Sequence, residues 1–376
     1  MAEHDLNDEF LTTQQRISLG DRALIAIAAH VEVRSVLRAD GQLRGHGLDD
    51  ILIGSYARRV SIWPGKDVDV FGRLTHHDVN TITPDAAYVM FGAALQPFAE
   101  QGRLTPQPRS YKVDYRRGRM PGEQFLRTAA AERGWARPRV DRIARELDQL
   151  AFEFSVDVVP AVAWGDHYGI PEVGRNVTTG ERYRTGHWRL TDPVELTNVT
   201  QERNRAPRIG GVGAYVRTVK AIRQVKAHHL PGVKPSALFY EFMLHDGFTE
   251  GAITGASWAD ITASALAYVS TRLHGIGERP VCDPVLNEEY QPAPASGDLT
   301  ACTTAFDDVA WAAQRAVRAS TRCQAAIEWR QVFGGNEEHD HVFPLPPGCR
   351  GTGAAMGAAA ANVAAGGTAE RSFGER

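Results

Sequence analysis

Two aspartates separated by one valine stand out in residues 54–71, GSYARRVSIWPGKDVDVF. Side chains two positions apart on a β-strand share a face, so Asp67 and Asp69 point the same way while Val68 and Val70 face the opposite layer. Two carboxylates this close repel each other unless a cation lies between them. Mg²⁺ prefers oxygen ligands and completes its shell with water and substrate phosphates. The pair therefore indicates a magnesium site that takes a phosphate-bearing substrate.

A glycine and a serine precede this pair at an expected strand-to-helix turn. Gly54 and Ser55 follow the apolar run DDILI, and eleven residues separate Ser55 from Asp67. Glycine lets the backbone approach a ligand closely, and the amides at a helix N-terminus bind phosphate. We expect Ser55 to cap a helix over 56–62, with its hydroxyl accepting a hydrogen bond from a free backbone amide.

A third carboxylate lies far along the chain. Asp157 interrupts the apolar run FSVDVVP, which alternates like a strand. Spacing alone does not identify a site, since Glu338 and Asp340 repeat it in a polar segment that we interpret as a solvated loop. The combination of a Gly-Ser turn, an acidic pair and a distant third acid is more specific than any one part.

The surrounding pattern predicts the elements that hold these residues. Alternating apolar residues predict strands over 67–74, 110–115 and 152–162, and helical spacing predicts one long helix from 12 to 37. After residue 193 the patterns are mainly helical. The expected fold class is therefore mixed α and β, an α+β arrangement of a sheet domain followed by a helical lobe.

Composition limits the remaining function classes. The formal net charge of −3 gives no reason to expect a nucleic-acid or membrane partner, and the longest apolar run is too short to span a bilayer. The cysteines form no C-x-x-C pair, which disfavours zinc, and we interpret the chain as cytoplasmic in a reducing environment. The four cysteines are Cys282, Cys302, Cys323 and Cys349.

The Gly-Ser turn, the acidic pair and the third acid together resemble the DNA polymerase β-like nucleotidyltransferase superfamily. More narrowly, residues 10–335 are similar to the branch of cyclic GMP-AMP synthase, oligoadenylate synthase and the bacterial cyclic-oligonucleotide synthases of anti-phage systems, the CD-NTases. The narrower resemblance rests on residues 54–71 and on several shorter segments. These are VDVVPAV (156–162), IPE (170–172), WRLTDP (188–193), YVRTVKAIRQVK (215–226) and KPSALFYEF (234–242).

The resemblance implies a set of catalytic residues. Asp67 and Asp69 would bind two Mg²⁺ ions, for which Mn²⁺ can substitute, and Asp157 would bind the second metal. The reaction would be in-line attack of a sugar hydroxyl on the α-phosphorus, which expels pyrophosphate. Gly54 and Ser55 would hold the β- and γ-phosphates.

The resemblance also implies contacts from the second lobe. Lys220 and Ser236 would bind the donor triphosphate, because a lysine supplies positive charge where negative charge builds up. Two other interpretations of Lys220 stand beside this one. It can lie on the solvated face of an amphipathic helix, and Lys226 is a rival for the same role.

The chain divides into four expected segments, and the resemblance covers neither the excursion at 116–150 nor the Gly/Ala tail. Residues 1–200 form the nucleotidyltransferase domain with an N-terminal brace helix, and residues 201–347 form the helical lobe. Residues 348–376 are a disordered Gly/Ala tail. The excursion at 116–150 carries nine arginines against five acidic residues. It is either a solvated helical insertion or a groove for a regulator, a protein partner or RNA.

The implied substrates are ATP, GTP or other nucleoside triphosphates. The implied product is a cyclic di- or trinucleotide second messenger that a separate effector reads in anti-phage defence. Two alternatives remain open on sequence alone. One is transfer of a nucleotide to RNA, a small molecule or a protein, and the other is a catalytically silent scaffold that binds RNA or protein.

Overall fold

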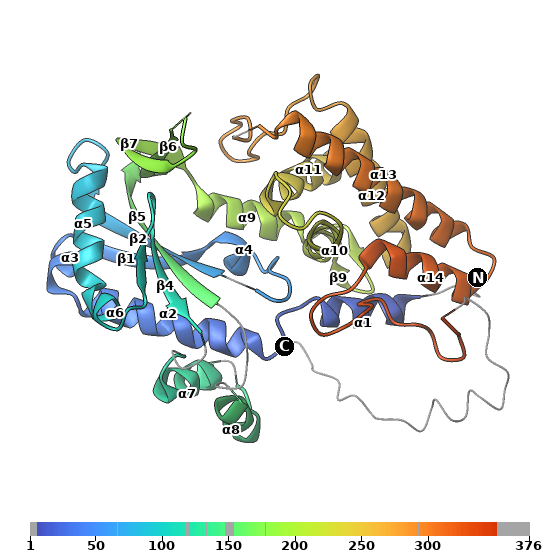
Figure 1. The fold of residues 1–376 in the computed structure, drawn as a ribbon, viewed down its shortest axis with the longest axis horizontal. Helices are drawn as coiled ribbons and strands as arrows, with labels where there is room; N and C mark the ends of the chain where they lie inside the picture. Colours follow the sequence, from blue (N-terminus) through green and yellow to red (C-terminus); the bar gives the residue numbers. More distant parts are fainter. Residues whose placement is uncertain are drawn as a thin grey trace. The chain divides into compact units, whose positions relative to one another are not determined.

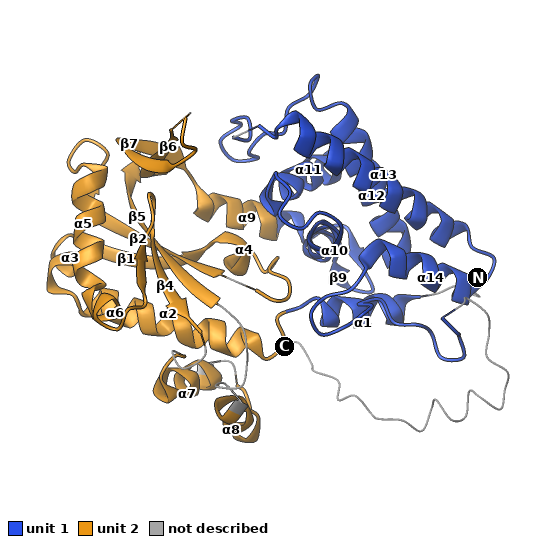
Figure 2. Ribbon diagram, viewed as in Figure 1, with its two compact units in different colours: residues 1–18, 202–376 blue, residues 19–201 orange. Residues whose placement is uncertain are grey.

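The computed structural model describes residues 6–65, 67–116, 120–132, 134–146, 154–176, 178–291 and 293–351. The chain forms two compact units, shown in orange and blue in Figure 2. We call Leu19–Gln201 the sheet unit, and Met1–Ser18 together with Glu202–Arg376 the helical unit. The first eighteen residues thus group with the helical unit, whereas the sequence suggested one domain over 1–200.

The N-terminal helix is interrupted, and the prediction of one helix over 12–37 is wrong. The structure has α1 (Asn7–Arg16) and α2 (Arg22–Ala39) on either side of a turn. Gly20 adopts a left-handed backbone there, with φ of +54°. Glycine enters this conformation without steric cost, so Gly20 lets the chain turn between the two helices although the apolar spacing continues.

The sheet unit contains a seven-stranded mixed sheet in the order β1-β2-β5-β4-β3, with β6 pairing β5 and β7 (Figure 1). β2 and β5 are parallel, and the other pairs are antiparallel. The predicted strands are confirmed as β2, β4 and β5, except that residues 152 and 153 lie outside the described part. The strands are β1 (Leu48–Ile53), β2 (Asp67–Asp78), β3 (Leu104–Pro106), β4 (Tyr111–Tyr115), β5 (Phe154–Trp164), β6 (His167–Arg175) and β7 (Arg182–Thr191).

The two faces of this sheet differ in how much apolar surface they bury. On one face, Val68, Val70 and Val156 are fully buried in the main core with α2 and α5. On the other, Phe71 and Ile170 belong to a much smaller cluster. The prediction that the two valines face the core is confirmed, and the opposite face is left for polar groups. The further helices of this unit are α3 (Gly41–Gly45), α4 (Gly54–Ala57), α5 (Pro84–Ala94), α6 (Gln96–Glu100), α7 (Glu123–Glu132), α8 (Arg137–Glu146) and α9 (Pro193–Arg203), which crosses into the helical unit.

The arginine-rich excursion forms α7 and α8, and α7 packs against α2. Several of its described arginines contact carboxylates of the same unit. Arg127 pairs with Glu123, while Arg139 and Arg142 both pair with Asp21 of the turn before α2. These ion pairs favour the interpretation of a solvated helical insertion that braces α2.

The helical unit is organised around aromatic packing. Phe10 of α1 lies edge-on to Trp329 and Phe343, with ring centroids 4.9 and 5.2 Å away. Glu9 of α1 is buried and pairs with Arg322. These contacts explain why the first helix groups with the C-terminal half. The elements of this half are β8 (Arg208–Ile209), β9 (Val212–Gly213), α10 (Ala214–His229), α11 (Ala237–Thr249), α12 (Trp258–His274), α13 (Ser296–Arg318) and α14 (Arg322–Phe333).

A disulfide joins Cys323 at the start of α14 to Cys349. It ties down the beginning of the segment that the sequence assigned to a disordered tail, and residues 352–376 of that segment lie outside the described residues. The cysteine spacing gave no sign of this pair, because the two residues meet only through the fold. A disulfide is more typical of oxidising compartments than of the reducing environment that we inferred.

No helix in the part of the chain that the structure describes is both long enough and apolar enough to cross a membrane.

Candidate active site

The pairing of β2 with β5 places the three predicted acids on one face of two neighbouring strands. Asp69 is the register partner of Asp157, and Asp67 is the partner of Ser155. Adjacent strands lie about 4.8 Å apart, and partner side chains point to the same side. The structure therefore brings Asp157 beside the acidic pair, although a long stretch of chain separates them.

Gly54 packs directly against one of these carboxylates. Its φ is +71°, and a β-carbon at this position would lie 1.9 Å from the Oδ2 atom of Asp69. The preceding residue, Ile53, is the register partner of Asp69. Gly54 is thus required by both the backbone conformation and the close approach of the acid.

Ser55 does not have the capping role that the sequence predicted. The helix α4 begins at Gly54, its N-cap position is Ile53, and the cap makes no side-chain hydrogen bond. The Ser55 hydroxyl instead lies 3.0 Å from the Oγ atom of Ser61. The predicted helix over 56–62 is short because Arg59 adopts a left-handed backbone, with φ of +62°.

The acids carry more negative charge than their surroundings compensate. Burial, followed by the charges of Asp67 and Asp157, raises the pKa of Asp69 to about 7 although the Arg58 guanidinium opposes this shift. Burial, followed by the charge of Asp67, raises the pKa of Asp157 to about 6, and Lys112 opposes this. A bound cation would relieve the repulsion that raises both values.

The donor chemistry of this face fits a divalent cation. Asp157 Oδ1 is buried and accepts no hydrogen bond in the described structure, which is unusual for a buried carboxylate oxygen. Carboxylate oxygens are the ligands that Mg²⁺ prefers. Among the described residues, no group of three or more His, Cys, Asp or Glu side chains is already gathered into a metal site. The fit to Mg²⁺ therefore rests on the strand register, the donor type and the unpaired oxygen.

Sequence reasoning missed the basic residues around the acids. Arg58 is buried at the end of α4 and acts on Asp69, and Lys112 of β4 is the register partner of Asp157. The alternation in SYKVDY predicted the strand but not which strand it would join. The missing signal is the pairing of β4 with β5, which no local pattern encodes.

The loop before Asp67 is held by a contact that sequence reasoning also missed. Arg22 of α2 lies over the Trp63 ring at 3.6 Å, and its Nη1 atom donates a hydrogen bond of 3.1 Å to the Pro64 carbonyl. Both contacts lie within the sheet unit. They fix the segment that leads from Ser55 to the acidic strand.

Lys220 and Ser236 belong to the helical unit, whereas the acids belong to the sheet unit. Lys220 on α10 donates a hydrogen bond of 3.2 Å to Ser18 Oγ. Ser236 precedes α11, and its hydroxyl lies 2.8 Å from that of Tyr290. Their assignment as donor-phosphate contacts stays a prediction.

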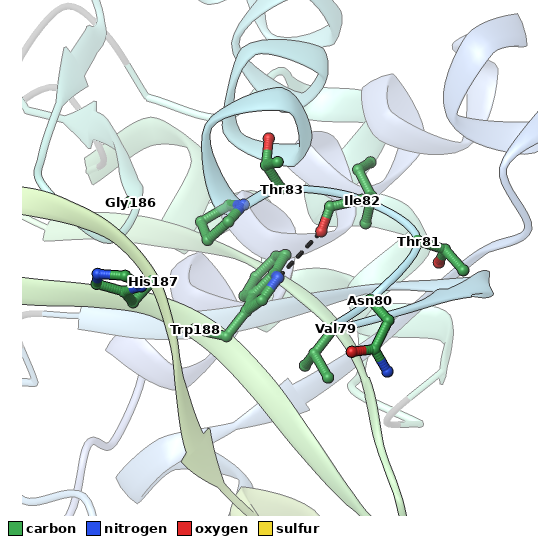
Figure 3. Close-up of a pocket in the computed structure, with 9 residues that line it drawn as sticks. Val79, Asn80, Thr81, Ile82, Thr83, Gly186, His187 and Trp188 are labelled. Atoms are coloured by element: carbon green, nitrogen blue, oxygen red, sulfur yellow. Dashed lines mark hydrogen bonds between the residues drawn. The ribbon is translucent and has the colours of Figure 1, made fainter.

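The sheet unit also has a pocket of about 320 Å³ between the loop after β2 and strand β7 (Figure 3). It follows the C-terminal end of β2, whereas Asp67 begins that strand. Trp188 forms part of its lining and donates a hydrogen bond of 3.1 Å to the Ile82 carbonyl, drawn as a dashed line in Figure 3. Trp188, one of the residues that carry the resemblance, therefore anchors β7 to this loop.

Comparison with known proteins gives matches at the level of structure. Neither a scan of protein-family models nor a search of curated proteins finds a match. The structure of E. coli MS115-1 CdnC with ATP has a TM-score of 0.60 at 13% identity, and the match covers 91% of this chain and 100% of that one. The Bradyrhizobium diazoefficiens CD-NTase CdnG in complex with GTP has a TM-score of 0.58 at 13% identity, with coverage of 88% and 96%. GTP-bound Vibrio cholerae DncV has a TM-score of 0.52 at 13% identity, with coverage of 86% and 79%. The resemblance inferred from the sequence is thus confirmed at the level of the fold: the chain has the mixed α and β fold of the CD-NTases.

Proposed function

We propose that this chain is a Mg²⁺-dependent nucleotidyltransferase that condenses nucleoside triphosphates into a cyclic di- or trinucleotide second messenger. The observation that carries the proposal is the register of Asp69 with Asp157 on the strand face next to Gly54. The similar solved structures support the substrate class, because they are described as holding ATP or GTP.

In this proposal Asp67, Asp69 and Asp157 hold two Mg²⁺ ions. When bound, these ions supply positive charge to the triphosphate and lower the pKa of the attacking hydroxyl. The backbone amides that follow Gly54 bind the donor phosphates, since no β-carbon blocks their approach. The Asp157 Oδ1 atom, which accepts no hydrogen bond in the described structure, would receive the hydroxyl proton.

The resemblance further supports a role in anti-phage signalling, with a separate effector reading the product. We place the chain in the cytoplasm on the same basis, since nucleoside triphosphates are abundant there. The Cys323–Cys349 disulfide is the observation that weighs against this location.

The decisive experiment is incubation of the purified chain with Mg²⁺ and each pair of labelled nucleoside triphosphates, followed by phosphatase treatment and mass spectrometry. We expect a phosphatase-resistant product with the mass of a cyclic di- or trinucleotide. Asp157→Asn should abolish it while the variant keeps its fold by circular dichroism.

Other outcomes identify the alternatives. Label that appears only on added RNA, protein or a small acceptor would replace cyclisation by nucleotide transfer. An absence of product and of pyrophosphate with all pairs, together with unaltered triphosphates, would leave the scaffold as the surviving function.

A further inference from the structure

A lysine and an aspartate on β4 border the acid-bearing face of the sheet. Lys112 is the register partner of Asp157, and Asp114 is the partner of Ser155. The Lys112 ammonium lies 2.7 Å from Asp114 Oδ1. The other oxygen of Asp114 accepts a hydrogen bond of 3.2 Å from Thr105 Oγ1 on β3. Asp114 is thus fixed from two sides and can hold the ammonium in place.

This pair changes the charge balance beside the third acid. Partner side chains on antiparallel strands have β-carbons about 5 Å apart, so Lys112 and Asp157 are neighbours on the same face of the sheet. Beyond burial and Asp67, which raise the pKa of Asp157, the Lys112 charge lowers it and the Asp114 charge raises it. Both charges on β4 therefore act on the third acid, with opposite signs.

We infer that Lys112 is a positioning residue whose ammonium, anchored by Asp114, acts as a fixed internal counter-charge and keeps the Asp157 carboxylate aligned with Asp69. The inference rests on the proposed function, because alignment of Asp157 matters only if this acid binds the cation. A polar surface pair with no such role would affect neither cation binding nor turnover.

The two charges have opposite consequences for a divalent cation. Without the lysine charge, the cation meets a more negative face and binds more tightly, but Asp157 loses the group that aligns it. Without the Asp114 charge, the ammonium is released toward Asp157 and competes with the cation. Lys112→Met keeps most of the apolar stem and removes the charge. In this variant the affinity for the cation should therefore rise while turnover falls.

The test measures Mn²⁺ binding to the full-length protein by electron paramagnetic resonance, alongside turnover at saturating Mn²⁺. We expect Lys112→Met to bind Mn²⁺ about three- to tenfold more tightly and Asp114→Asn to bind it more weakly by a similar factor. Turnover in Lys112→Met should fall about tenfold. Lys112→Arg should restore both values toward those of the unmodified chain, and thermal melting confirms that each variant is folded.

The outcomes separate this inference from the proposed function. If the unmodified chain shows no Mn²⁺ binding that depends on Asp157, both the proposed metal site and the role of Lys112 are overturned. If it binds Mn²⁺ but Lys112→Met and Asp114→Asn leave the affinity unchanged, only the role of Lys112 is overturned. A shift of both variants in the same direction also overturns it.

Discussion

Gly54 is constrained by its own backbone and by its neighbour at the same time. Gly54→Ala places a side chain in a left-handed conformation, which costs roughly 1–2 kcal/mol, and pushes its β-carbon into the Asp69 carboxylate. We expect urea titrations to show this loss of unfolding free energy. Product formation should fall roughly a hundredfold, as expected when a catalytic group moves by about 1 Å.

Gly165 provides a matched control for this substitution. It has a similar φ of +59°, but a β-carbon there meets no atom within 4 Å. Gly165→Ala should show the conformational cost and retain turnover. Equal turnover losses in the two variants would mean that contact with Asp69 is not the reason for glycine at position 54.

The raised pKa values of Asp69 and Asp157 predict a pH dependence for the metal-free protein. Both groups bind protons more tightly in the folded state than at the ordinary value of 3.8. The folded state therefore holds more protons than the unfolded state between about pH 4 and pH 7, so stability should fall as the pH rises through this window. Melting temperatures in EDTA from pH 4.5 to 7.5 test this, against a background of other titrating groups.

Asp69→Asn isolates the contribution of this acid, because the amide does not titrate. The stability of the variant should fall less steeply with rising pH than that of the unmodified chain. The variant should also be more stable near pH 7. An identical pH profile in both proteins would contradict a shifted pKa at Asp69.

At the scale of the element, the loop before β2 depends on α2. Arg22→Met keeps an unbranched stem of similar volume but removes the charge above the Trp63 ring and the donor to the Pro64 carbonyl. We expect a loss of roughly 1–3 kcal/mol of unfolding free energy. The nucleotide concentration needed for half-maximal turnover should also rise, since this loop joins Gly54 to the acidic strand.

Arg137→Met is the control for Arg22, because Arg137 is largely exposed and its nearest carboxylate contact is 3.9 Å long. It should change stability and turnover little. If the two substitutions give the same stability, the contact with Trp63 does not hold the loop.

The elements also show what local sequence patterns can predict. Alternation identified β2, β4 and β5, and the burial of Val68 and Val70 on the face opposite the acidic pair followed from the same period of two. The turn between α1 and α2 and the shortness of α4 were missed, since the single left-handed residues Gly20 and Arg59 change the chain direction without disturbing the apolar spacing. The residues that lie beside Asp157 on the neighbouring strands could not be predicted from the sequence, because strand pairing depends on contacts between distant segments.

At the scale of the whole molecule, the C-terminal segment has two parts with different expected roles. A chain that ends at Arg350 keeps the Cys323–Cys349 disulfide, whereas one that ends at Gly348 loses it. The first should have normal stability and turnover, because residues 351–376 are rich in glycine and alanine and offer few large side chains to a core.

The shorter chain should lose roughly 3–4 kcal/mol of unfolding free energy under non-reducing conditions, the entropy of closing a loop of this length. A reducing agent should remove the difference between the two chains. Cys282→Ser, which alters a free cysteine, should leave stability nearly unchanged. Loss of turnover in the chain ending at Arg350 would show that the last residues contribute to catalysis.

The parallel pairing of β2 with β5 has a consequence for how the protein is made. β1 and β2 pair antiparallel and are close in sequence, so they can associate early, while β5 is contributed by a much later part of the chain and lies between β2 and β4. Contacts between distant segments form slowly, because their loop entropy must be overcome first. On a translating ribosome, the edge of β2 that pairs with β5 therefore stays open until β5 has emerged, so Asp157 joins Asp67 and Asp69 late in synthesis. Under the proposed function, incomplete chains lack the full set of acids.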